Sequence, residues 1–231
     1  MTSDFGIYIH TPWCRTRCPY CAFNVFLDDS SDYLRWKNGI IDAWRAVAGR
    51  MEGAAHSLYF GGGTPSLAPP AIIGELIDAL PIETDAEITL EVNPGTIDAV
   101  GLQAFREAGV NRVSLGIQTF HPDHAKKLGR GHTATQAIDL LHHVPTIGFN
   151  SWSMDLMFSL PDQSEDELSR DLDALLEIGP PHVSIYGLSI EPYTPFHKAF
   201  QAGKFDLPEP EAWRRMYDNI VDRLQSAGLH R

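Results

Sequence analysis

The sequence predicts an α/β fold in which six parallel strands curl into a partial (β/α)6, TIM-like barrel. Short strand-like segments alternate with helical segments along the 231 residues, which is typical of a parallel sheet with right-handed crossovers. Apolar and polar side chains alternate within the strands, and polar residues gather near the strand ends. A hydrophobic fraction of 43% is enough for a full core.

The strand segments indicate that the sheet is curled. We predict strands at residues 6–10, 57–60, 87–92, 112–118, 152–158 and 182–188. In the third of these, Ile88, Leu90 and Val92 alternate with polar residues, whereas parallel strands covered by helices on both faces read as continuous apolar runs. One apolar and one polar face suit a barrel with helices outside and a solvated, ligand-holding interior.

Four helical segments have clear periodicity or clear ends. Apolar residues recur at helical spacing over 33–47 and 213–224, and a third helix lies between Pro70 and Pro81. A capping box, Ser164-x-x-Glu167, begins the fourth, which ends before Gly179-Pro180. Because no linker separates these segments, we expect a single domain over 1–231.

Charge and hydropathy narrow the function class. The net charge is −12 and the pI about 5.2, which disfavours a nucleic-acid partner because its phosphates would be repelled. Apolar runs stay short of the ~18–20 residues of a membrane span. The first residues lack the basic-then-apolar pattern of a secretion signal, so we expect a cytoplasmic, reducing location.

The three cysteines of the chain form one C-x3-C-x2-C motif, Cys14, Cys18 and Cys21. Thiolates are the usual ligands of iron–sulfur clusters, and three of them leave one iron of a 4Fe–4S cubane open for a small chelating ligand. A Cys3His zinc site with His10 is an alternative. A disulfide with one free thiol is another, which a reducing compartment disfavours.

The motif follows the first strand directly, so it lies at the rim where β/α barrels hold ligands. The polar residues at strand ends, Tyr8, His10, Glu91, Gln118 and Asp155, point to the same rim. After the second strand comes a glycine run at 61–63, which lets backbone groups approach a ligand but is more often a tight turn. It matches no nucleotide-phosphate fingerprint.

Ordered motifs run through the chain from residue 8 to residue 196. They comprise Tyr8-Ile-His10-Thr-Pro-Trp-Cys14, Cys18-Pro-Tyr-Cys21, Gly-Gly-Gly-Thr-Pro-Ser at 61–66, Glu91-Val-Asn-Pro-Gly, Gly109-Val-Asn-Arg-Val-Ser-Leu-Gly-Ile-Gln118-Thr-Phe, Leu128-Gly-Arg130, Asp155-Leu-Met-Phe-Ser-Leu-Pro161 and Ile190-Glu-Pro-Tyr-Thr-Pro-Phe196. Together they resemble the radical S-adenosylmethionine (SAM) superfamily and, within it, the oxygen-independent coproporphyrinogen III oxidase group.

The resemblance implies a set of cofactors and ligands. The three cysteines would bind the 4Fe–4S cluster, and the open iron would bind SAM, which an electron from flavodoxin or ferredoxin cleaves to a 5′-deoxyadenosyl radical. The implied SAM contacts are Tyr8, Gly62, Gly63, Thr64 and Glu91. Positions that hold a second SAM in the oxidase match Tyr20, Gln118, Arg130 and Asp155. Alternatively, Arg130 and Asp155 form an interior ion pair.

One substitution separates two functions within the group. The oxidase has a further cysteine two residues after the third, where this chain has Phe23. That departure resembles the haem chaperone branch, which keeps the cluster and SAM, binds haem and passes it to an acceptor protein, although that branch often has Asp at the position of Ala22. We therefore expect a haem chaperone, with a porphyrinogen-decarboxylating oxidase as the alternative and no catalytic residue assigned.

The resemblance also predicts a missing region. Chains of this family continue well beyond the position of Arg231 and carry there a His-Asn-x-x-Tyr-Trp stretch associated with haem binding. We expect this sequence to be a fragment or to lack the substrate-covering half. A barrel that binds only the cluster and SAM is then a third possibility.

Overall fold

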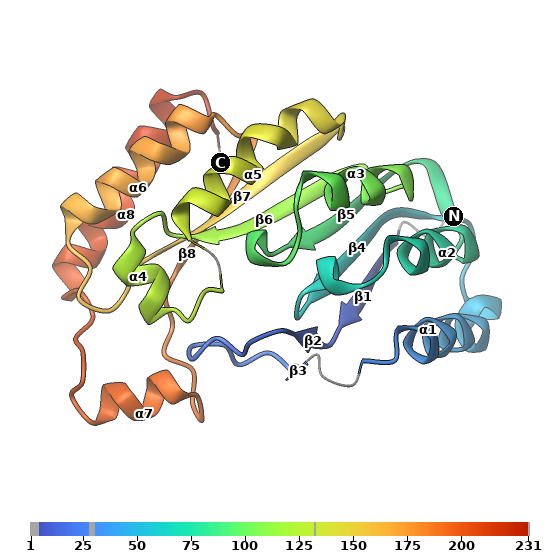
Figure 1. The fold of residues 1–231 in the computed structure, drawn as a ribbon, viewed down its shortest axis with the longest axis horizontal. Coiled ribbons are helices and arrows are strands. Elements are labelled where there is room, and N and C mark those ends of the chain that lie inside the picture. The colour runs from blue at the N-terminus through green and yellow to red at the C-terminus, as the bar shows by residue number, and fades with distance from the viewer. Residues whose placement is uncertain (1–4, 28–30, 132, 231) are drawn as a thin grey trace.

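The computed structural model describes residues 5–27, 31–131 and 133–230. At its centre is a parallel sheet of six strands in chain order (Figure 1). The strands are β1 (Gly6–Thr11), β4 (Ala55–Gly62), β5 (Ile82–Val92), β6 (Arg112–Gln118), β7 (Ser151–Phe158) and β8 (His182–Gly187). The predicted α/β fold with a six-stranded partial barrel is confirmed.

Helices lie between successive strands of the sheet, and two more follow β8. The longer ones are α1 (Tyr33–Val47), α2 (Pro70–Ala79), α3 (Ala99–Glu107), α5 (Ala134–Ile147), α6 (Glu165–Ile178) and α8 (Pro210–Ser226). Short helices are α4 (Pro122–Lys127) and α7 (Pro195–Gln201), with single 3-10 turns at η1 (Ala48–Arg50), η2 (Pro65–Leu67) and η3 (Pro94–Thr96). A small parallel pair, β2 (Trp13–Cys14) and β3 (Phe26–Leu27), lies apart from the main sheet.

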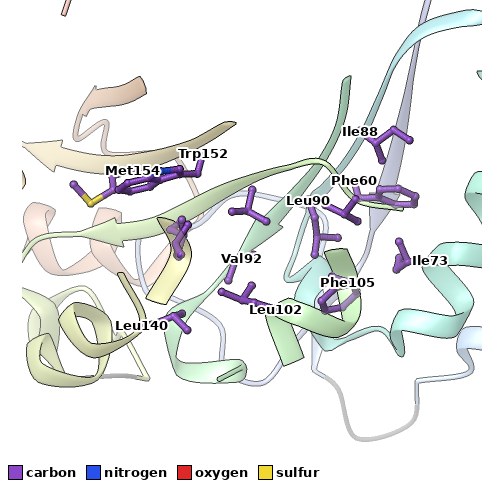
Figure 2. Packing of buried hydrophobic residues seen from close by; sticks show 14 of the residues in the cluster. Phe60, Ile73, Ile88, Leu90, Val92, Leu102, Phe105, Leu140, Trp152 and Met154 are labelled. Atoms are coloured by element: carbon purple, nitrogen blue, oxygen red, sulfur yellow. The ribbon is translucent and has the colours of Figure 1, made fainter. Parts of the chain in front are cut away.

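The main core lies between the outer face of the sheet and the helices. Phe60 of β4, Leu90 of β5 and Phe105 of α3 are fully buried and belong to one cluster (Figure 2). Each such side chain contributes about 1.5–3 kcal/mol through removal from water. The neighbours of Leu90 on the strand, Thr89 and Glu91, lie on the other face. The alternation in the sequence therefore divides a packed face from a ligand-facing one.

The ends of α6 agree with the sequence features that predicted them. The capping box predicted at α6 is present, with Ser164 accepting from the Glu167 backbone and Glu167 accepting from the Ser164 backbone. Gly179 closes that helix in the left-handed region at φ 67°. The helices α3, α4, α5 and α7 lie in segments where we specified none. Pro145 interrupts the α5 pattern, and the other three have nine residues or fewer.

Two strands differ from the predicted limits by more than one residue. The strand β5 begins at Ile82 instead of residue 87, because Glu83, Thr84 and Asp85 near its start are polar and exposed and give no apolar period. The strand β4 starts at Ala55, with a register shift against β5 between Ala55 and Ser57. Among the described helices, none is both long and apolar enough to cross a membrane.

Candidate metal and cofactor site

A cavity of about 590 Å³ opens at the carboxyl ends of the strands. It is bounded by the cysteine loop and by residues from β4 to β8. The predicted site residues that line it are Cys14, Cys18, Tyr20, Cys21, Gly62, Gly63, Thr64, Glu91, Gln118, Arg130 and Asp155. Tyr8 is the exception: its side chain lies outside the lining, 58% exposed, and stacks on Tyr59 with ring centroids 6.0 Å apart.

The three cysteines enter this cavity from one loop. Cys14 ends β2, and a turn in which the Cys21 backbone N–H donates to the Cys18 carbonyl (3.1 Å) follows. All three are half-buried free thiols. All three line the same cavity, and in a 4Fe–4S cluster each thiolate would bind a different iron.

The predicted zinc alternative required His10 as the fourth ligand. The His10 Nε2 lies 2.9 Å from the Asn24 carbonyl oxygen, and its Nδ1 lies 3.3 Å from the Tyr8 hydroxyl. Both ring nitrogens therefore already have partners away from the sulfurs. His10 is a rim residue here, as expected, and the donor set fits an iron–sulfur cluster better than a Cys3His zinc site.

Hydrogen-bond donors surround the sulfurs. The Thr64 hydroxyl donates to Cys14 Sγ at 3.4 Å, and Arg130 Nη1 lies 3.9 Å from Cys18 Sγ. Burial raises the pKa of the Cys14 thiol, and the hydrogen bond from Thr64 opposes that shift. Burial likewise raises the pKa of Cys21. Because metal binding requires thiolates, cluster assembly must release protons from these thiols.

The glycine loop after β4 holds the cysteine loop closely. The Gly63 N–H donates to the Thr11 carbonyl (2.7 Å), and a Cβ on Gly63 would lie 2.6 Å from the Trp13 carbonyl oxygen. Gly62 has φ 108°, and a Cβ there would overlap the His10 ring at 2.4 Å. The two glycines are thus required for contact between the loops, a reason that sequence reasoning did not supply.

Glu91 lines the cavity with a carboxylate that is held at both oxygens. Its Oε1 accepts a hydrogen bond from the Tyr59 hydroxyl (2.9 Å), and its Oε2 accepts one from the Gly62 N–H (3.1 Å). Burial raises the pKa of Glu91, and the carboxylate of Asp155 adds to that increase. Tyr59 was not identified from the sequence as a partner of Glu91. Strand alternation could have indicated it, because Tyr59 lies between the buried residues Leu58 and Phe60 and therefore faces inward.

A second group of polar residues lies deeper along β6 and β7. The Ser114 hydroxyl lies 3.0 and 3.2 Å from the two Asp155 carboxylate oxygens and 2.7 Å from the Ser153 hydroxyl. Burial raises the pKa of Asp155. Sequence reasoning missed Ser114 as a partner, since serine in a strand carries no distinct signal.

The Arg130 guanidinium contacts the β6 backbone and the cysteine loop. Its Nη2 donates to the Gly116 carbonyl at 2.6 Å, while Nη1 faces Cys18. Among the described ion pairs, none joins Arg130 to Asp155, so the alternative of an interior ion pair is not found. Gln118 ends β6 with a left-handed φ of 71°, next to a register shift that brings its side chain to the cavity.

Curated relatives include two bacterial proteins named heme chaperone HemW. The protein of Escherichia coli is 40% identical, with 96% of this chain and 60% of the relative covered. The protein of Bacillus subtilis is 32% identical, again covering 96% and 60%. This chain therefore spans about 60% of the length of these relatives.

Among solved structures, the E. coli coproporphyrinogen III oxidase HemN, described as a radical SAM enzyme, superposes with a TM-score of 0.82. It is 25% identical, and the alignment covers 97% of this chain and 53% of that one. The sequence profile of the radical SAM superfamily matches residues 8–175, which is more than half of the chain. With the cysteine loop and the six-stranded barrel in agreement, this chain belongs to the radical SAM superfamily.

Proposed function

We propose that this protein is a haem chaperone built on a radical SAM scaffold, in which haem is bound near a SAM-loaded 4Fe–4S cluster and passed to an acceptor protein. The observation that carries the proposal is Phe23. It stands where the oxidase group has a further cysteine, lines the cavity and is 61% exposed. The identity to the HemW relatives, 32–40%, is also higher than the 25% to HemN.

The cofactors of the superfamily, a 4Fe–4S cluster and SAM, fit the residues at hand. In the proposed roles, Cys14, Cys18 and Cys21 hold the cluster. The bound cluster supplies single electrons when an external donor, such as flavodoxin or ferredoxin, reduces it. Hydrogen bonds to sulfur from Thr64 and Arg130 stabilise the thiolate charge.

The remaining predicted contacts would hold SAM. Glu91 is fixed by two donors, so its remaining lone pairs are oriented toward the cavity, where they can accept from ligand hydroxyls or an ammonium group. We assign Gly62, Gly63 and Thr64 to the same ligand, and Tyr8 to the support of Tyr59 and His10 at its edge. Tyr20, Gln118, Arg130 and Asp155 provide polar contacts for a second SAM or for a polar group of the transported ligand.

Apolar side chains at the cavity support haem as the cargo. Haem is a broad apolar plane with two anionic propionates. Phe23, Val25, Met157 and Leu188 line the cavity, and Arg17 lies among them as a cation for a propionate. We propose that the radical SAM core over residues 1–231 is a single domain that contributes these side chains to the haem site.

Two further expectations accompany this function. The acidic balance, −12, favours protein and small-molecule partners over nucleic acid. Iron–sulfur clusters and free thiols are best preserved in a reducing environment, so we propose a reducing compartment such as the cytoplasm.

The second candidate is an oxygen-independent coproporphyrinogen III oxidase, favoured by the TM-score of 0.82 to HemN. Anaerobic incubation of the reconstituted protein with haem, and separately with coproporphyrinogen III, SAM and a reductant, separates the two. We expect a haem Soret band at one haem per chain and no decarboxylated product. Protoporphyrinogen formation would reject the chaperone, and a missing Soret band with no turnover would reject both.

A matched variant sharpens this test. Phe23→Cys restores the cysteine of the oxidase group, whereas Phe26→Cys places a thiol at an equally exposed residue of β3 outside the cavity lining. We expect haem affinity to fall in the first variant and to stay within about twofold in the second, because only the first shortens an apolar wall of the cavity. Equal effects of the two variants would remove Phe23 from the haem site.

A further inference from the structure

A second group of metal-binding side chains lies outside the barrel, where α4 meets the start of α6. It consists of His121, His124 and Glu167, and their potential ligand atoms all lie within 4.8 Å of one another. The two histidines are the residue before α4 and the third residue of the helix, so they share one face. None of the three lines the cysteine cavity.

The geometry is that of donors converging on one point. The His121 Nε2 lies 3.5 Å from Glu167 Oε1, and the His124 Nε2 lies 3.3 Å from Glu167 Oε2. Donor atoms of a tetrahedral zinc site, at bond lengths of 2.0–2.1 Å, lie about 3.4 Å apart. The three potential ligand atoms lie within 4.8 Å of one another, so the two nitrogens are at most about 1.4 Å further apart than in such a site.

Burial makes this group costly without a ligand. His124 is 3% exposed, and neither of its ring nitrogens has a hydrogen-bond partner. The 3.3 Å contact of its Nε2 with Glu167 is within ion-pair range but lacks hydrogen-bond geometry. Buried polar atoms are almost always satisfied, and each that is not costs about 1–3 kcal/mol. The unsatisfied Nε2 lies beside the carboxylate of Glu167, so an ion bound between them would satisfy it.

The carboxylate has one oxygen to spare. Its Oε2 accepts hydrogen bonds from the Ser164 backbone (2.8 Å) and hydroxyl (2.9 Å) in the capping box of α6. Its Oε1 has only the 3.5 Å contact to His121 among the described residues. Asp171, one turn further along α6, fixes the segment before α4 through Thr119 (2.7 Å) and Phe120 N–H (2.8 Å).

We propose that His121, His124 and Glu167 bind one divalent transition-metal ion, with Zn²⁺ as its probe. Two imidazoles and one carboxylate are a ligand set that zinc and neighbouring divalent metals accept, and water completes the coordination. The partly exposed side chains of His121 (24%) and Glu167 (22%) give the ion a path from solvent. The site is independent of the haem-chaperone function.

The ion would also connect two structural units. The helix α4 leads directly to Gly129 and Arg130. A Cβ on Gly129 would lie 2.7 Å from Pro19, and Arg130 faces Cys18. Binding at the start of α4 therefore fixes that helix against α6 close to the cysteine loop.

The test uses the anaerobically reconstituted protein with four irons per chain, because empty cysteines would themselves bind zinc. Equilibrium dialysis against Zn²⁺, followed by metal analysis, gives zinc and iron per chain. We expect one zinc per chain with the iron content unchanged. His124→Ala should lower zinc affinity more than about tenfold, and His142→Ala/His143→Ala, on the exposed face of α5, should leave it unchanged.

Glu167→Gln separates metal binding from folding. Glutamine at the same position of the α5 capping box (Gln136 with Thr133) shows that the amide can serve that cap. This variant should fold, with an unchanged circular dichroism spectrum, and lose zinc affinity about tenfold or more because the anionic ligand is gone. The proposed site is wrong if the protein takes up no zinc, or if zinc enters only as iron leaves. It is also wrong if His124→Ala and Glu167→Gln both keep the zinc affinity of the unchanged protein.

Discussion

The two faces of the sheet differ in what they hold. On the outer face of β5, Leu90 is fully buried against helices, while one residue away Glu91 faces the cavity and accepts two hydrogen bonds. The outer face contributes stability through apolar burial, and the inner face holds polar groups at a cost in desolvation. Substitutions on the two faces should therefore fail in different ways, stability on one side and ligand binding on the other.

The largest effect is expected at the cysteine loop. Cys18→Ala should abolish the broad visible absorption of the reconstituted protein, because two thiolates hold a cubane poorly. Thr16→Ala in the same loop is the matched control and should keep about four irons per chain. Iron and acid-labile sulfide analysis checks both. Four irons in the Cys18 variant would contradict the ligand assignment.

The outer face is tested next. Leu90→Ala should lower the free energy of unfolding by about 2–5 kcal/mol, because it leaves a cavity in the core. The affinity of the folded protein for SAM should not change. Val100→Ala, on a side chain 77% exposed, should cost less than about 0.5 kcal/mol. Denaturant unfolding with SAM titration measures both quantities, and a Leu90 variant that loses SAM affinity while folded would break the division between faces.

The inner face gives the reverse pattern. Glu91→Gln should weaken SAM binding by about 1–1.5 kcal/mol, because a charge-assisted hydrogen bond becomes a neutral one, and leave the iron content unchanged. Glu107→Gln at the end of α3 is the matched control. Isothermal titration of the cluster-loaded protein decides. Unaltered affinity would return Glu91 to a purely structural role.

The smallest expected effect is on pH dependence. Burial raises the pKa of Glu91 above 4.5, so the folded apoprotein keeps a proton that the unfolded chain has already lost. The stability that the folded protein gains from this bound proton is present at acid pH, and it disappears as the pH rises through the raised pKa. Glu91→Gln should therefore stabilise the apoprotein at neutral pH, with the gain vanishing toward pH 4. Denaturant unfolding at several pH values measures it, and a gain that grows on acidification would contradict this sign.

Much of the inner face could be predicted from the sequence, since strand alternation and motif order indicated Glu91, Asp155 and the cysteine loop. The residues that packing brings next to these side chains could not be predicted from the sequence. Tyr59 and Ser114 depend on which strand lies beside which, and the pairing of His121 with Glu167 joins residues 46 positions apart through two helices. The short helix α4, between them, has too few residues to produce a periodic signal.

The central claim is that three thiolates bind a cubane cluster and leave one iron available to SAM. Electron paramagnetic resonance of the anaerobically reduced protein, recorded before and after SAM addition, tests it most directly. The claim predicts about four irons per chain and a cluster signal that shifts when SAM is added. Stoichiometric zinc at the cysteines with no bound iron, or a signal that SAM leaves unchanged, would contradict it.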